Sequence, residues 1–262
     1  MVIWKHEWRQ NFKTFLIFCI TVGICCCGCV LMFDSVAESM EQMAAGFAGM
    51  GSFATAFGMD KVSIATLEGF YAAEINLIFS LGGAMFAAMT GAALLSKEEE
   101  GHTAEFLHTL PLGRTAILVS KYAALLTLIV AFNGVGILFE AVGICCVGGE
   151  FAWKEYMLYH GMSLLMQLEI GSVCFLVSAC AKKKQIGAAL GLSVLLYLVD
   201  VMCRVVPDLE WTRFVTPFYY CNAADIFSGS ETEVLSIGIG VAVTVASVVA
   251  AEMIYKKRDI VG

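Results

Sequence analysis

The sequence predicts an all-α, polytopic membrane protein, and three observations carry this prediction. Hydrophobic residues make up 59% of the 262 residues and charged residues only 15%, whereas soluble domains carry about 25% charged residues. The apolar residues gather in six runs of about 20 residues, the length that crosses a bilayer as a helix. The three prolines, Pro111, Pro207 and Pro217, lie between these runs, so we expect uninterrupted helices.

The distribution of positive charge predicts the orientation of the spans. The six predicted transmembrane helices cover residues 15–33, 75–95, 117–147, 157–181, 186–206 and 235–255. Four of the 16 Lys and Arg residues lie on one side of them, namely Lys61, Lys154, Arg204 and Arg213, and the other twelve lie on the opposite side. Because Lys and Arg accumulate in cytoplasmic loops, we expect both termini to be cytoplasmic and the chain to lie in the plasma membrane.

The first fourteen residues predict an amphipathic helix in the cytoplasmic interface. Trp4, Trp8 and Phe12 recur at helical spacing, and Lys5 and Arg9 are among the polar residues between them. Trp side chains anchor helices at the headgroup level. We therefore interpret Trp4 and Trp8 as interfacial anchors; the alternative is that residues 1–14 only extend the first span.

The first outer segment, residues 34–69, is long and carries an apolar stripe that includes Met43 and Phe47. The stripe consists of Met40, Met43, Phe47, Met50, Phe53 and Phe57, spaced three or four residues apart as on one helix face. Three interpretations remain open. The stripe is an outer interfacial helix, an outer gate or substrate surface built from adaptable Met and Phe, or a Cu(I) site made of Met thioethers.

The second inner loop, residues 96–111, is the most informative segment. Ser96 and Glu99 have the spacing of a capping box, and an apolar face at helical spacing follows before Pro111 ends the helix. The sequence therefore predicts a short amphipathic helix outside the membrane. Its acidic start would be repelled by anionic lipid, so we expect its apolar face to bind a protein partner.

This loop resembles the first cytoplasmic loop of the type-2 ABC exporter permeases. The resemblance rests on the run Lys97-Glu98-Glu99-Glu100-Gly101-His102-Thr103-Ala104-Glu105-Phe106-Leu107, followed by Leu110-Pro111 and Arg114, and then by Lys121. His102 and Gly113 depart from the usual pattern. The segment Thr216-Pro217-Phe218-Tyr219-Tyr220 and the end Tyr255-Lys256-Lys257-Arg258-Asp259-Ile260 are also similar to segments of that family.

The resemblance implies two partners and a coupling role for the loop. It implies that residues 96–111 hold a coupling helix that seats in an ABC ATPase subunit. The coupling residues would be Glu98, Glu99, Glu100, Thr103, Glu105, Phe106, Leu107 and Leu110. It also implies that two permease chains pair, as a homodimer or a heterodimer. Gly187 and Gly191 in the fifth span have the spacing that allows close helix approach. They would lie either at the interface between the two chains or at a helix contact within one chain.

The sequence lacks the motifs of an ATPase or an intramembrane enzyme. No Gly-x4-Gly-Lys-Ser/Thr loop occurs, so we expect ATP and Mg²⁺ to bind the partner ATPase and this chain to carry no cofactor and no metal. No His-Glu-x-x-His zinc motif occurs either. We expect the four histidines to be solvated or to lie at the membrane boundary. No basic patch or tail suggests binding of nucleic acid.

Ionisable and amide side chains inside predicted spans are costly in hydrocarbon and are candidates for function. Glu140 and Asn133 lie in the third predicted span and Glu169 in the fourth. They would line a substrate pathway or make hydrogen bonds between helices. Asp200 and Arg204, spaced i, i+4 in the fifth span, suit a local ion pair.

Taken together, the sequence predicts the membrane permease subunit of an ATP-driven exporter. The substrate would be a hydrophobic peptide, a lipid, a drug or a cation. The alternative is a non-transporting scaffold or sensor subunit of an ABC-type complex. A transporter should line its dimer interface with Glu140, Glu169 or the apolar stripe, whereas a scaffold should bury them. Most of the eleven cysteines lie in apolar runs and are interpreted as packing, while the redox state of Cys203 and Cys221, near outer loops, stays open.

Overall fold

The apolar runs fold into long helices in the computed structural model, which describes residues 2–48, 51–56, 58–103, 111–230 and 234–257. Within these residues no strand occurs, and six helices are long and apolar enough to cross a membrane. The predicted all-α fold with six spanning helices is therefore confirmed. The six helical segments are α1 (Val2–Ala48), α3–η1–α4 (Leu67–Ala93), α7 (Arg114–Val147), α8 (Trp153–Cys180), α9 (Ile186–Val205) and α11 (Val234–Lys257).

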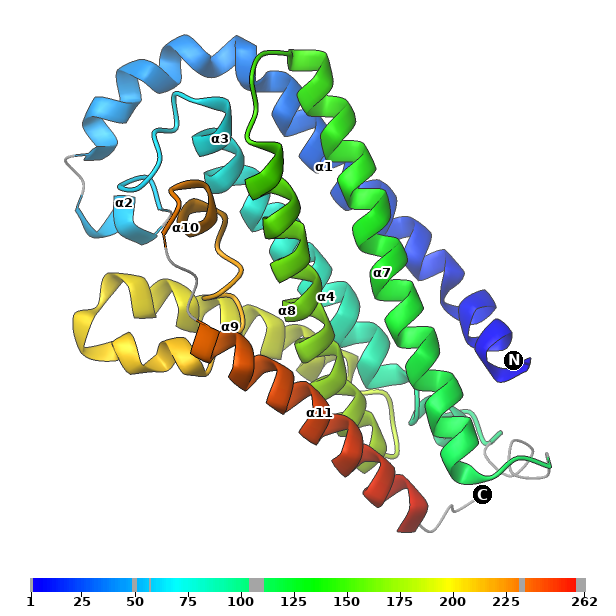
Figure 1. Cartoon of the computed structure of the whole chain (residues 1–262). Helices are drawn as coiled ribbons and strands as arrows, with labels where there is room; N and C mark the ends of the chain where they lie inside the picture. The colour runs from blue at the N-terminus through cyan, green and yellow to red at the C-terminus, as the bar shows by residue number, and fades with distance from the viewer. Residues whose placement is uncertain (1, 49–50, 57, 104–110, 231–233, 258–262) are drawn as a thin grey trace.

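Short elements connect the spans. They are α2 (Ser52–Ala56), α5 (Lys97–Glu100), the 3₁₀ helix η2 (Pro207–Phe214) and α10 (Ala223–Phe227). The second span contains a π-helical turn, η1 (Tyr71–Ile75), between α3 (Leu67–Phe70) and α4 (Asn76–Ala93). The start of α1 and the end of α11 lie at the same end of the bundle (Figure 1), as an even number of spans requires.

Helix α1 is one continuous helix of 47 residues. At 1.5 Å per residue it is about 70 Å long, more than twice the roughly 30 Å hydrocarbon thickness of a bilayer. Residues 1–14, predicted as an interfacial helix, are described from Val2 onward and run into the first span without a break. Their position in the interface stays a prediction. The C-terminal part of α1 arches over the end of the bundle near α3 (Figure 1).

Helices α4 and α8 form the inner part of the bundle. In the most apolar 18-residue stretch of each of these two spans, 61% is buried, against 22% in the corresponding stretches of α9 and α11. Helix α8 packs against α4 on one side and α11 on the other, while α1 runs beside α7 (Figure 1). Gly91 allows the close approach of α4 to α8, because a Cβ there would lie 2.4 Å from the carbonyl oxygen of Gly171.

The capping box predicted at the start of the loop is wrong. Ser96 lies in the turn before α5 with helical backbone angles, and its hydroxyl donates to the carbonyl of Ala92 rather than capping α5. The helix predicted across residues 96–110 is also interrupted, because α5 ends at Glu100 and His102 adopts a left-handed φ of 52°. The Thr103 N–H then donates to the carbonyl of Glu98, as in a Schellman-type helix end.

Candidate functional site

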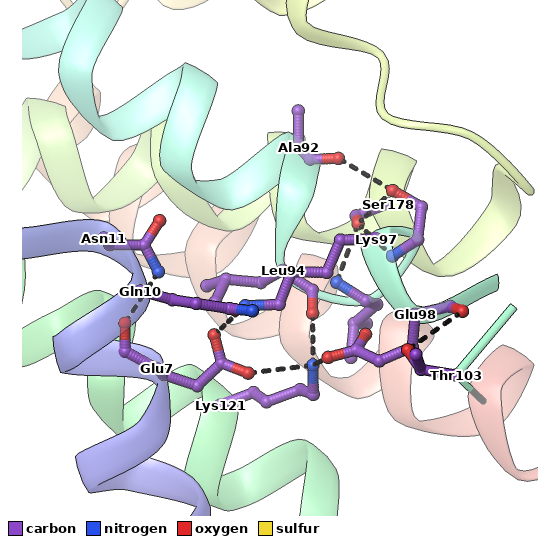
Figure 2. Close-up of polar contacts among 12 residues, drawn as sticks. Glu7, Gln10, Asn11, Ala92, Leu94, Lys97, Glu98, Thr103, Lys121 and Ser178 are labelled. Carbon is purple, nitrogen blue, oxygen red and sulfur yellow. Dashed lines mark hydrogen bonds and ion pairs between the residues drawn. The ribbon is translucent and has the colours of Figure 1, made fainter. Parts of the chain in front are cut away.

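A buried amine organises the base of the 96–111 loop. The Lys121 side chain on α7 is completely buried, and its Nζ lies 3.0 Å from Oε1 of Glu7 on α1. The same amine donates to the carbonyl of Leu94, 2.6 Å away, and pairs with Glu98 on α5. Figure 2 shows Glu7 and Glu98 converging on Lys121 from two helices. A buried amine must be paired and hydrogen-bonded, so this contact fixes α1, α5 and α7 to one another.

Lys97 completes the cluster next to Lys121. Its amine pairs with Glu7 and also donates to Gln10 on α1. Burial lowers the pKa of the Lys97 amine, and the neighbouring Lys121 lowers it further, while Glu7 opposes both. The cluster thus holds two amines, Lys97 and Lys121, and two carboxylates, Glu7 and Glu98, and its charges balance.

Further hydrogen bonds tie the loop base to α8 and to the start of α9. The Ser178 hydroxyl on α8 accepts the backbone N–H groups of Leu95 at 2.9 Å and Ser96 at 3.0 Å. The Glu100 carboxylate accepts the backbone N–H of Lys184 at 2.7 Å. We call the joined set Glu7, Leu94–Glu98, Glu100, Lys121 and Ser178 the loop base. It connects the loop with α1, α7, α8 and the segment before α9.

The structure places half of the predicted coupling residues. Glu98 turns inward to Lys121, Glu100 is exposed, and Thr103 lies at the exposed end of the described loop. Glu99 also lies on α5. Glu105, Phe106, Leu107 and Leu110 lie outside the described residues, so the apolar docking face stays a prediction.

A cavity of about 450 Å³ opens beside the loop base. It lies between α1, α4, the loop and the start of α9. Its polar lining includes His6, Gln10, Lys97 and Lys184, and its apolar lining includes Met89. A cavity with both kinds of wall has the chemistry to hold an amphiphilic molecule.

The two predicted tryptophan anchors have a protein partner. The indole N–H groups of Trp4 and Trp8 donate to the Thr127 hydroxyl on α7, at 3.0 and 2.7 Å. Their rings also contact each other at 6.2 Å between centroids. These contacts fasten the start of α1 to α7, and anchoring in the interface stays a prediction.

The polar residues predicted for a substrate pathway are buried inside the chain. Glu140 is completely buried and Glu169 is 8% exposed. The Asn133 amide on α7 donates to Oε1 of Gln167 on α8 at 2.7 Å. Glu169 accepts the Tyr220 hydroxyl at 2.9 Å. Each group therefore has a partner within one chain. The side chains of Met43 and Phe47 lie outside the described part of the structure.

The expectation that the histidines are solvated or at the boundary is wrong for His160. Its side chain is 3% exposed and its Nε2 lies 3.1 Å from Oε2 of Glu140. The pairing escaped the sequence analysis because 20 positions separate the two residues on different helices. The burial and ion pairing of Lys121 were not predicted either, although it stands four positions inside a predicted span, where an ionisable residue is a signal for function.

The glycines predicted at the dimer interface face outward. Gly187 and Gly191 are exposed on α9, and a Cβ at either position would meet nothing within 4 Å. The spacing is therefore not used for close packing within this chain. This leaves the surface open to lipid or to a second chain, and the pairing stays a prediction.

The predicted ion pair in the fifth span is confirmed and is part of a larger cluster. Arg204 Nε lies 3.1 Å from Oδ2 of Asp200. Its Nη1 also lies 2.8 Å from Oδ2 of Asp225, which in turn pairs with Lys61. The cluster links α9 with α10 and with the first outer segment. Asp225 and Lys61 could not be predicted as members of this cluster, because both lie far from Arg204 along the chain.

Six helices that are long and apolar enough to span a membrane, joined by a loop fastened to four parts of the bundle, define the class of multi-pass membrane proteins. Comparison with protein-family models matches residues 1–260 to the family described as ABC-2 family transporter protein. The chain therefore belongs to the ABC-2 transporter family, and it is a membrane permease component of an ABC-type system. A search of curated proteins finds no match.

Proposed function

We propose that this chain is the permease subunit of an ATP-driven exporter, and that a separate ABC ATPase subunit binds ATP and Mg²⁺ and docks on the 96–111 loop. The loop base carries the proposal. A docked ATPase can move the spans only through a stiff contact, and Lys121, Ser178 and Glu100 join the loop to α7, α8 and the start of α9.

The proposed orientation places the loop base, both termini and the 450 Å³ cavity on the cytoplasmic side. The cavity would receive the substrate there, and ATP-driven movement of the loop would close it and release the substrate outward. Its mixed lining favours an amphiphilic molecule within the range of hydrophobic peptide, lipid, drug or cation. A second permease chain would pair along α9, where Gly187 and Gly191 are exposed.

One observation favours the second candidate, a scaffold or sensor subunit that does not transport. A scaffold is expected to bury Glu140 and Glu169 within the chain, and both are buried there. The two candidates share the ATPase partner and differ in substrate movement. ATP-dependent uptake of a fluorescent lipid or drug panel into inverted vesicles discriminates them, because a scaffold supports none.

The docking step is tested by purifying the tagged chain from its native membrane in mild detergent. The wild type should retain a protein with a P-loop, identified by its peptide sequence. The Phe106→Asp/Leu107→Asp double variant should lose it, whereas Lys183→Asp, an exposed change on the same side, should retain it. Retention of the ATPase by the double variant would place the docking site elsewhere. Purification of no ATPase with the wild type or with either variant would contradict the proposal.

A further inference from the structure

A second buried cluster lies within two helical turns of the α7–α8 connection, at the opposite end of these helices from the loop base. Oε2 of Glu140 on α7 accepts the Tyr71 hydroxyl at 2.5 Å and lies 3.1 Å from Nε2 of His160 on α8. The Tyr71 oxygen is also 3.3 Å from that nitrogen. Tyr71 and Glu140 are completely buried and His160 is 3% exposed. Three side chains from three spans therefore meet at one carboxylate oxygen.

The neighbours of this cluster are weak acids and apolar rings. Tyr156 and Tyr159 on α8 pack their rings on His160, with centroids 4.5 and 5.1 Å away. The thiol of Cys26 on α1 faces Glu140. From α4, Phe79 packs on His160, and from α10, Phe227 packs on Tyr71. Tyrosine and cysteine side chains are largely uncharged at neutral pH, so His160 is the basic group that balances Glu140.

The number of protons on Glu140 and His160 determines the buried charge. With one proton, the pair is either carboxylate and imidazolium or carboxylic acid and neutral imidazole, and both forms have no net charge. With no proton a carboxylate that has hydrogen bonds but no counter-charge is buried, and with two protons an imidazolium is buried beside a neutral carboxylic acid. An uncompensated buried charge costs several kcal/mol, so the folded protein should keep one proton here.

The backbone provides an independent sign that this place is specialised. Tyr71 begins the π-helical turn η1, which interrupts the second span. Single π-turns inside α-helices occur frequently at functional sites. Glu140 Oε1 and His160 Nδ1 are buried and have no hydrogen-bond partner among the described residues, so the contact between the two groups runs through Oε2 and Nε2.

We propose that Glu140, His160 and Tyr71 form a buried proton-binding site that holds one proton and thereby joins η1, α7 and α8. The ligand is a proton, and the Tyr71 hydroxyl fixes the Glu140 oxygen that receives it. The proposal does not depend on the ATPase partner, since all three residues lie in this chain.

The proton count is tested by equilibrium unfolding of the purified full chain in mixed micelles from about pH 7.5 to about pH 9. In the unfolded chain a solvated Glu is charged and a solvated His largely neutral over this range, so unfolding releases the bound proton. The unfolding equilibrium constant should therefore rise about tenfold per pH unit more steeply in the wild type than in Glu140→Gln. Asp208→Asn, which removes an exposed carboxylate, should keep the wild-type slope. Equal slopes in the wild type and Glu140→Gln would overturn the proposal.

A second variant tests the same site through a different signal. In His160→Gln the one remaining place for the proton is Glu140, so infrared spectra at neutral pH should show a carboxylic acid C=O band. The band should be absent from the His160→Gln/Glu140→Gln double variant. If His160→Gln shows no such band, Glu140 is ionised without its partner and the site does not hold a proton. This result decides the question even if Glu140→Gln does not fold.

Discussion

At the residue scale, Lys121 brings two carboxylates and a backbone carbonyl to one buried amine. Removing this buried amine therefore has a different effect on stability from removing a surface lysine. Lys121→Met keeps much of the side-chain volume but leaves Glu7, which is 1% exposed, with one cationic partner, Lys97, in place of two. The substitution therefore tests whether the loop base is held by charge or by packing.

We expect Lys121→Met to lower the free energy of unfolding by about 3 kcal/mol, because removing one partner of a buried pair leaves the other charge poorly compensated. Adding Glu7→Gln should recover part of this loss, because it removes the buried carboxylate that Lys121→Met leaves poorly compensated. Equilibrium unfolding in mixed micelles measures the wild type, Lys121→Met, Glu7→Gln and the double variant. Losses that simply add in the double variant would show that the two side chains do not interact.

Asp225 supplies a pH-dependent contact at the other end of the bundle. Burial raises the pKa of its carboxyl, but Arg204 and Lys61 outweigh burial and hold it below its usual value. A carboxyl with a lowered pKa in the folded state stabilises the protein above its unfolded pKa, and this contribution is lost as pH falls through the folded value. We expect the thermal midpoint of the wild type to fall on acidification below about pH 4, and that of Asp225→Asn to fall less. Parallel pH curves for the two proteins would refute this role.

At the element scale, the packing of α4 on α8 depends on glycine. Gly91→Ala adds a methyl group 2.4 Å from the carbonyl oxygen of Gly171. We expect a destabilisation of about 1–3 kcal/mol, larger than the gain of about 1 kcal/mol in helix propensity. Gly187→Ala is the matched control, because the added methyl meets nothing within 4 Å in this chain. Its unfolding should be unchanged or slightly more favourable to the folded state, and a loss equal to that of Gly91→Ala would contradict the described packing.

The same pair of variants addresses the second permease chain. If α9 is the dimer interface, Gly187→Ala should weaken pairing of two chains while leaving the fold intact. Size-exclusion chromatography with light scattering, in detergent and at several protein concentrations, measures this shift. Gly91→Ala should not change the monomer–dimer equilibrium at concentrations where the protein stays folded. Unchanged pairing in Gly187→Ala would place the interface on another helix.

How far the sequence predicts these elements depends on the distance over which each signal acts. Apolar runs of membrane-spanning length and the placement of three prolines are local signals, so six helices could be predicted. The i, i+4 pair of Asp200 and Arg204 is local too, and it forms. Glu7 and Lys121 lie 114 positions apart, and helix periodicity says nothing about which faces of two distant helices meet.

Local signals also failed where a longer-range contact competes. The spacing of Ser96 and Glu99 suits a capping box, but the Ser96 hydroxyl bonds to Ala92 and its N–H bonds to Ser178. His160 lies near the start of a predicted span, where a residue at the membrane boundary is expected. Only the fold brings Glu140 and Tyr71 to it. In both cases a tertiary hydrogen bond outweighs the preference that the sequence shows.

At the scale of the whole molecule, the proposed ATPase docks at one end of the bundle and acts on the helices that cross the membrane. The loop base is the connecting part, because it holds α1, α7, α8 and the start of α9 together. The contact between the loop and the ATPase is the central claim.

Photo-crosslinking in native membranes tests that claim most directly. A benzophenone amino acid is placed in turn at Glu99, on α5 in the loop, and at Asp208, on η2 at the opposite end of the bundle. We predict that the Glu99 position crosslinks to a P-loop ATPase, identified by its peptides, and that the Asp208 position does not. Crosslinking to the ATPase from Asp208 but not from Glu99 would reverse the proposed orientation, and no crosslink to an ATPase from the loop would contradict the account.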